Sequence, residues 1–337
     1  MAPAPVENPF ERDESPVIRL RAFCNGDPPA LVSLWNRGLP GRGSVRPLGP
    51  HEFDAQVIAR IVFDREGLIV AEEEDGRVVG FAHASFGPES SAGPSHRLDR
   101  DLGTIAMLVV DPDRDDPGLI LGLFEAAEAH LRRRGARVFY AGGQGELGSF
   151  YRGIYGGSEC SGILDGHAAF RRAATLAGYE PVASSVFLEA PIGDGEARDP
   201  RGAFLRRQTR VEIVEDAMPA DWWEAIALGH TEITRFRVVA KADDRELARA
   251  STWDMAAFGR VDGKARTGLI DLEVAESERR KGYGRFLVAE ILRHAKSQWA
   301  EIVAVQTRTT NLAALGLYLS AGFEPVDSST LYRRPGP

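Results

Sequence analysis

The first half of the chain alternates between short apolar runs of strand period and longer segments of helical period. The apolar runs predict strands at residues 17–23, 68–72, 77–86, 103–110, 138–141 and 182–188. Segments with one apolar face predict helices at residues 28–37, 51–63, 119–134 and 167–177. Strands and helices that follow one another in this way are typical of a mixed α/β domain.

The second half repeats the same order of elements. It predicts strands at residues 211–214, 269–274 and 302–307, a hairpin at 236–255, and a last strand from 326. The predicted helices cover residues 221–232, 283–298 and 312–320. Residues 191–202 separate the halves and are polar and rich in proline and glycine, which predicts a linker.

The repetition extends to the residues themselves. Ala177–Ser185 (AGYEPVASS) matches Ala321–Ser329 (AGFEPVDSS), and Phe81–Ser85 (FAHAS) matches Leu247–Ser251 (LARAS). Two matches in the same order, beside similar strands, indicate an internal repeat. We expect a disordered tail at residues 1–16, a first repeat at 17–190, a linker at 191–202 and a second repeat at 203–337.

Composition limits the classes of function. The 337 residues suit two domains, and 43% hydrophobic residues suffice for a sizeable core. A net charge of −8 argues against nucleic acid as a partner, and the two cysteines suggest neither a metal site nor a disulfide framework. No apolar run is long enough to span a membrane, and residues 1–13 lack a signal-peptide core. We therefore expect a cytoplasmic protein without a metal, whose oligomeric state stays open.

The second repeat carries a candidate phosphate site. Its apolar strand Leu269–Val274 leads into Arg279-Arg280-Lys281-Gly282-Tyr283-Gly284, which opens an amphipathic helix. The glycines let the backbone approach a ligand, helix amides bind phosphate, and the three basic residues add charge. The alternative is an ordinary basic turn before a core helix. A dinucleotide-binding fold fits poorly, because Leu287 stands where a third glycine is required.

The first repeat has lost this pattern. Asp115 aligns with Arg279, Gly118 with Gly282 and Ile120 with Gly284, so acidic residues replace the basic ones. Later in the repeats, His167 aligns with Asn311 and Ala174 with Tyr318. The first repeat also carries a glycine-rich insertion at residues 142–166. We expect the ligand site in the second repeat alone, with the insertion helping to close the site for a second substrate.

Two stretches of the second repeat resemble the GCN5-related N-acetyltransferase (GNAT) family. Arg279–Gly284 resembles its acyl-CoA pyrophosphate loop, Q/R-x-x-G-x-G/A, and Asn311–Phe323 (NLAALGLYLSAGF) resembles its N-x-x-A-x-x-x-Y-x-x-x-G-F segment. The resemblance implies two tandem GNAT-like domains, each a central mixed β-sheet flanked by helices. It also implies acetyl-CoA as co-substrate and transfer of the acetyl group to an amine, from a small molecule or a peptide.

The same resemblance implies roles for single residues. Tyr318 is the general acid that protonates the CoA thiolate, and Asn311 holds the pantetheine arm. Backbone groups of Leu272 and Val274 bind the pantetheine amides. The chemistry is consistent, because a phenol of pKa about 10 can donate a proton to a thiolate of pKa about 8.5. The alternative for Tyr318 is a packing role with its hydroxyl at the surface.

Two carboxylates on the strand before the turn are candidates for a general base. Asp271 and Glu273 alternate along the strand and are expected on one side of it. Either can accept the proton of an ammonium group, and both attract a cationic amine. The alternative is a half-exposed sheet face with solvated acids. A protein that binds acyl-CoA without catalysis, as a sensor or scaffold, is the second reading of the whole chain.

Overall fold

The computed structural model describes residues 17–89, 97–114, 116–143, 145, 147–159, 162–193, 201–228 and 231–335. The expected tail at residues 1–16, most of the expected linker and Asp115 lie outside these ranges. In the described part, both repeats form the predicted strands and helices in the predicted order, and the strand Ile163–Leu164 and the helix Gly202–Gln208 are additional. Within those ranges, no helix combines the length and the hydropathy that crossing a bilayer requires.

The elements of the first repeat lie close to their predicted positions. They are β1 (Ile18–Ala22), α1 (Pro28–Gly38), α2 (Pro50–Phe53), β2 (Leu68–Glu73), β3 (Val78–Pro88), β4 (Leu98–Val110), α3 (Pro117–Arg133), β5 (Val138–Ala141), β6 (Ile163–Leu164), α4 (Ala168–Leu176) and β7 (Glu180–Pro191). The helix expected at residues 51–63 is shorter, because α2 passes into one π-helical turn, Asp54–Ile58, that ends it.

The second repeat has a similar succession, with one helix between its first strand and its hairpin where the first repeat has two. Its elements are α5 (Gly202–Gln208), β8 (Thr209–Val214), α6 (Trp222–Leu228), β9 (Ile233–Ala240), β10 (Glu246–Asp254), a 3-10 helix (Ala256–Val261), β11 (Arg266–Val274), a short 3-10 turn (Glu276–Glu278), α7 (Tyr283–Ser297), β12 (Ile302–Arg308), α8 (Leu312–Ser320) and β13 (Glu324–Arg333). Helix α5 was not expected from the sequence, which is polar at its start.

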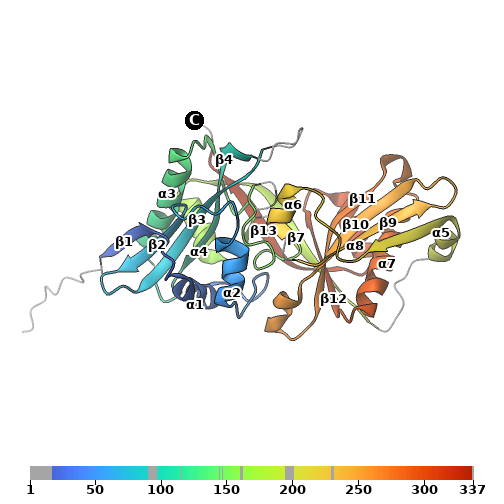
Figure 1. The fold of residues 1–337 in the computed structure, drawn as a ribbon, viewed down its shortest axis with the longest axis horizontal. Coiled ribbons are helices and arrows are strands. Elements are labelled where there is room, and N and C mark those ends of the chain that lie inside the picture. Colours follow the sequence, from blue (N-terminus) through green and yellow to red (C-terminus); the bar gives the residue numbers. More distant parts are fainter. Residues whose placement is uncertain are drawn as a thin grey trace, which may run out of the picture.

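The two repeats share one sheet. The strand order is β1-β2-β3-β4-β5-β13-β7-β12-β11-β10-β9-β8, and β6 pairs with β13. The last strand of the second repeat, β13, thus lies between β5 and β7 of the first. In turn, β7 lies between β13 and β12, antiparallel to both. Figure 1 shows β13 and β7 side by side where the two repeats meet. Each repeat therefore completes the sheet of the other.

The hydrophobic core also crosses from one repeat to the other. Alternate residues of each strand face opposite sides of the sheet. On one side, α3 and α4 cover the first repeat, and α7 and α8 cover the second. On the other side, a single buried cluster joins Trp35 and Tyr155 of the first repeat to Trp253 and Ile270 of the second. Separating the repeats would expose this shared cluster, so they form one folded unit.

Candidate active site

The candidate site is a cleft between β11 and β12. These strands pair in parallel only from Arg266 to Leu269 and from Ile302 to Val305. Beyond Leu269 they diverge, and a cleft of about 1350 Å³ opens between them. At the same point the register of β10 and β11 shifts, and Asp271 takes a φ of +53°. This bulge bends β11 away from its neighbour, since one unpaired residue disrupts the ladder locally.

The cleft collects nearly every site residue that the sequence singled out. Asp271, Leu272, Glu273, Val274, Arg279, Arg280, Gly282, Tyr283, Gly284, Asn311 and Tyr318 all line it. Lys281 is absent from the lining, and its ammonium group lies 3.0 Å from the carboxylate of Glu278. The residues come from the strand, the turn and α8, so the fold brings together segments separated in sequence.

The turn before α7 has the geometry of an anion site. Gly282 has a φ of +101°, which favours glycine, and it has no side chain to cap the helix. The amides of Tyr283 and Gly284, the first two of α7, can therefore bind a ligand. A Cβ on Gly284 would lie 3.3 Å from Leu317 and 3.4 Å from Val274, so glycine keeps the floor of the cleft open. Arg279 and Arg280 are exposed at the mouth.

The corresponding turn of the first repeat is closed to an anion. Asp116 caps α3, and its carboxylate accepts a hydrogen bond of 2.8 Å from the amide of Gly118. Pro117, the first residue of α3, has no N–H at all. The glycine-rich insertion also fills the space beside β5, since a Cβ on Gly142 would lie 2.3 Å from Ile163. The first repeat thus lacks both the free amides and the room.

Helix α8 presents Asn311 and Tyr318 to the cleft. The side chain of Asn311 caps the helix by accepting a hydrogen bond of 3.2 Å from the amide of Ala314. Tyr318 lies two turns later and is 5% exposed. Burial, and next the negative charge of Glu159, raise the pKa of the Tyr318 phenol well above its usual value. The phenol is therefore protonated at neutral pH, as a proton donor must be.

The two carboxylates of β11 differ in their surroundings. Both are exposed, because they lie where β11 has left β12. The Glu273 carboxylate binds the guanidinium of Arg249 at 2.6 Å. Asp271 has no ion pair within the described residues. Both lie at the edge of the cleft, where their charge can attract a cation.

One carboxylate of the cleft was not expected there from the sequence. Glu159 belongs to the glycine-rich insertion of the first repeat, yet it lines the cleft of the second. Its Oε1 atom lies 3.5 Å from the backbone nitrogen of Asp271. Burial, and next the nearby Asp271 carboxylate, raise the pKa of Glu159. A glutamate in a loop carries no pattern that identifies it, so only the fold could reveal this position.

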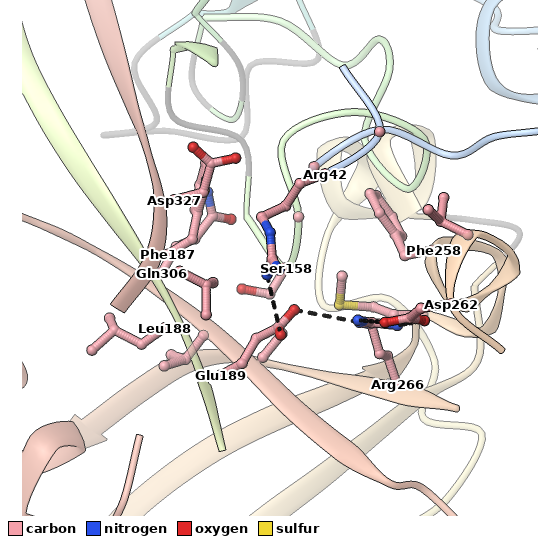
Figure 2. A pocket seen from close by; sticks show the side chains of 18 residues that line it. Arg42, Ser158, Phe187, Leu188, Glu189, Phe258, Asp262, Arg266, Gln306 and Asp327 are labelled. Carbon is pink, nitrogen blue, oxygen red and sulfur yellow. Dashed lines mark hydrogen bonds and ion pairs between the residues drawn. The ribbon is translucent and has the colours of Figure 1, made fainter. Parts of the chain in front are cut away.

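A second cavity of about 180 Å³ lies where the two repeats meet. Figure 2 shows Glu189 of β7 between Arg42 of the first repeat and Arg266 of the second. The carboxylate of Glu189 lies 3.5 Å from the guanidinium of Arg42 and 3.3 Å from that of Arg266. Asp262 and Asp327 also line it, and burial raises the pKa of Asp327. Val305 and Gln306 of β12 line both this cavity and the cleft. The two spaces therefore adjoin along β12.

Helix α6 of the second repeat packs against the first repeat. The indole of Trp223 donates a hydrogen bond of 3.1 Å to the carbonyl of Gly145, and the guanidinium of Arg60 donates one to the carbonyl of Ile226. Arg235, on β9, forms an ion pair of 2.8 Å with Glu224 of α6.

Comparison with known proteins supports the fold. One relative, named mycothiol acetyltransferase, from Saccharomonospora viridis, is 32% identical over 123 residues, which are 35% of this chain and 38% of that protein. A tandem GNAT protein from the clavulanic acid biosynthesis pathway superposes with a TM-score of 0.62 at 16% identity, over 94% of this chain and 98% of that one. A glucosamine N-acetyltransferase region of a fungal β-N-acetylglucosaminidase gives 0.69 at 16% identity, over 95% of this chain and 38% of that chain.

The repeats themselves match a known family. The sequence profile of the Acetyltransferase (GNAT) family matches residues 30–147 and again residues 205–323. The match with mycothiol acetyltransferase spans less than half of that relative, and likeness to structures at 16% identity concerns the fold alone. The two profile matches cover most of the chain, in the order that the internal repeat predicts. The chain belongs to the GNAT family and is a tandem of two GNAT domains.

Proposed function

We propose that the chain is an acetyl-CoA-dependent N-acetyltransferase whose second repeat carries out the reaction. One observation carries the proposal: the turn Arg279–Gly284, the strand end at Asp271 and the phenol of Tyr318 line one cleft. The free amides of α7 and the two arginines suit the pyrophosphate of CoA. The diverging strands suit its extended pantetheine arm, which can pair with the open edge of β11.

The reaction needs the acetyl thioester near the bulge of β11 and the sulfur near Tyr318. The acceptor amine must lose a proton before it can attack the thioester carbonyl. The C–N bond then forms, the C–S bond breaks, and Tyr318 gives its proton to the departing thiolate. Most of the rate gain would come from holding the two substrates in contact, which the two adjoining spaces favour.

We place the acceptor in the cavity between the repeats. Its charged lining holds three carboxylates, Glu189, Asp262 and Asp327, against two guanidinium groups, Arg42 and Arg266. This excess of negative charge favours a cationic amine. The cavity of about 180 Å³ suits a small amine group rather than a folded protein segment. Residues 157 and 158 of the insertion form part of the wall, so the first repeat would help to hold the acceptor.

The test is turnover with acetyl-CoA and a panel of amines, followed by release of free thiol and by the mass of the product. The panel contains polyamines, amino sugars, aminoglycosides, peptide N-termini and the amine substrate of mycothiol acetyltransferases. We expect the mass of at least one small amine to rise by about 42 Da, because an acetyl group replaces one hydrogen of the amine. Tight binding of acetyl-CoA without turnover of any amine would favour the alternative function, a sensor or scaffold that binds acyl-CoA.

A further inference from the structure

The insertion of the first repeat reaches the cleft of the second at Glu159. The indole of Trp253 on β10 donates a hydrogen bond of 3.0 Å to the carbonyl of Ser158. The side-chain oxygen of Gln306 on β12 accepts one from the amide of Glu159. Two strands of the second repeat therefore hold the peptide group that joins Ser158 to Glu159. A side chain on a backbone fixed in this way has a defined position in the cleft.

The carboxylate of Glu159 lies beside the bulge of β11, in the lining of the cleft. Its Oε1 atom is 3.5 Å from the amide of Asp271, at the bulge where β11 leaves β12. It is close enough to Tyr318 for its charge to raise the pKa of that phenol. The residues beside it in the chain, Gly157 and Ser158, line the acceptor cavity. Glu159 therefore lines the cleft proposed for acetyl-CoA and directly follows the residues that line the cavity proposed for the acceptor.

We propose that Glu159, from the first repeat, is the general base of the acetyl-transfer site in the second repeat. This inference rests on the proposed function. The Glu159 carboxylate takes one proton from the ammonium group of the acceptor, and the neutral amine attacks the carbonyl carbon of acetyl-CoA. The C–N bond forms and the C–S bond breaks, with the electron pair leaving on sulfur. Tyr318 protonates the thiolate, and the second amine proton restores the phenol.

The charged surroundings of Glu159 suit this role. Asp271 on β11 faces it and disfavours its charged form, while Arg152 in its own loop favours that form. Tyr318 on α8 and Gln306 on β12 complete the set of polar groups around it. Burial is the largest influence, and it raises the pKa of Glu159 towards the pH at which the reaction runs. A base is most effective when its pKa lies near the working pH.

The other acids of the cleft fit the role less well. Glu273 is bound to Arg249, and Asp271 has an exposed side chain. Burial raises the pKa of Glu159, whereas the side chains of Asp271 and Glu273 are exposed. Asp271 and Glu273 are better suited to drawing a cationic amine towards the cleft. The assignment also gives the degenerate first repeat a reason to be retained, because the second repeat alone has no equivalent of Glu159 at this point of its cleft within the described residues.

The test compares Glu159→Gln, Glu159→Asp and the control Glu74→Gln, which changes an exposed carboxylate in a turn of the first repeat. We expect Glu159→Gln to lower kcat about 100-fold or more at pH 7 while the Kd for acetyl-CoA stays within about twofold. Its activity should rise with pH towards the pKa of the acceptor amine, because only unprotonated amine then reacts. Glu159→Asp should keep the pH profile of the wild type at a lower kcat. Glu74→Gln should match the wild type.

The outcomes separate this inference from the proposed function. If the wild type acetylates an amine and Glu159→Gln keeps its kcat and pH profile, Glu159 is not the base, although the function stands. If the wild type binds acetyl-CoA but acetylates nothing in the panel, the function fails and this inference fails with it. Thermal unfolding of each variant shows whether a loss of activity reflects a loss of folding. If Glu159→Gln unfolds, a normal pH profile and kcat in Glu159→Asp overturn the assignment.

Discussion

The carboxylate of Asp116 lies 2.8 Å from the amide of Gly118 and caps α3. The residue that precedes α7, the matching helix of the second repeat, is Gly282, which has no side chain. A side chain of the protein thus occupies in one repeat the position that is left for a ligand in the other. The two turns otherwise share their place between a strand and a helix, β4 and α3 against β11 and α7. This pair of turns makes the second repeat the expected position of CoA.

We expect one CoA to bind per chain, in the second repeat. Arg279→Glu should raise the Kd for CoA by about tenfold or more, since a charged hydrogen bond contributes roughly 1.5–3 kcal/mol. Arg133→Glu makes the same charge change on the exposed end of α3 and should leave the Kd unchanged. Isothermal titration calorimetry gives both the stoichiometry and the Kd. Two sites of similar affinity would contradict this reading of the Asp116 cap.

A second prediction concerns the glycine that begins α7. Gly282→Ala places a Cβ at a φ of +101°, and the strain costs roughly 1–2 kcal/mol. Gly178→Ala is a matched control, because Gly178 also has a positive φ, +77°, but lies outside the cleft. Both variants should unfold at lower temperature by a similar amount. CoA binding should weaken in Gly282→Ala alone, because only Gly282 adjoins the α7 amides that we propose bind the pyrophosphate.

Much of the fold could be predicted from the sequence because its signals are local. The period of apolar residues set most strands and helices to within a few residues, and the matching nonapeptides revealed the repeat. The turn Arg279–Gly284 and the pair Asn311 and Tyr318 could be found because glycines, charges and helical spacing are visible in the letters. The structure brings these residues to one cleft.

Other features depend on contacts between distant segments and have no local signal. The sequences of β7 and β13 are alike, so no pattern shows that each completes the sheet of the other repeat. Glu159 lies 112 residues from Asp271 in sequence and meets it only through the folded insertion. The bulge at Asp271 likewise depends on where β11 parts from β12. These features arise from tertiary packing, which overrides local preference.

A third prediction concerns the proton donor. Tyr318→Phe should lower kcat by about 100-fold or more, while the Kd for CoA changes little, because the ring and its packing remain. Tyr140→Phe removes a phenol of β5, outside the cleft, and should have no effect on kcat. Because burial raises the pKa of Tyr318 above its usual value of about 10, the wild-type rate should not fall from loss of this proton below pH 10. Steady-state rates from pH 6 to pH 10 check both points.

A fourth prediction concerns stability against pH. His83 and His167 are buried, and burial lowers the pKa of each from 6.5 to about 3. Both are neutral in the fold but become charged in the unfolded chain below pH 6.5, so stability is lost as the pH falls from 6.5. The loss is about 1.4 kcal/mol per pH unit for each histidine. Urea unfolding at pH 7 and pH 5 should show it, and His167→Gln should lose less between these pH values than the control His51→Gln, whose histidine is exposed.

The last prediction follows from the pairing of β7, in the first repeat, with β12 and β13 of the second. A protease site inserted between Gly193 and Arg201 lets the chain be cut between the repeats after it has folded. The fragments should stay together on gel filtration in dilute buffer, because β7 of one is paired with β12 and β13 of the other and they share the buried cluster around Trp253. They should separate only in denaturant, and the cut protein should keep its CoA binding. In a control protein the protease site is placed at the C-terminus, after Pro335, so that cutting leaves the two repeats joined. The control and the protein cut between the repeats should elute at the same volume. Fragments that separate without denaturant would show that the strand exchange does not hold the repeats together.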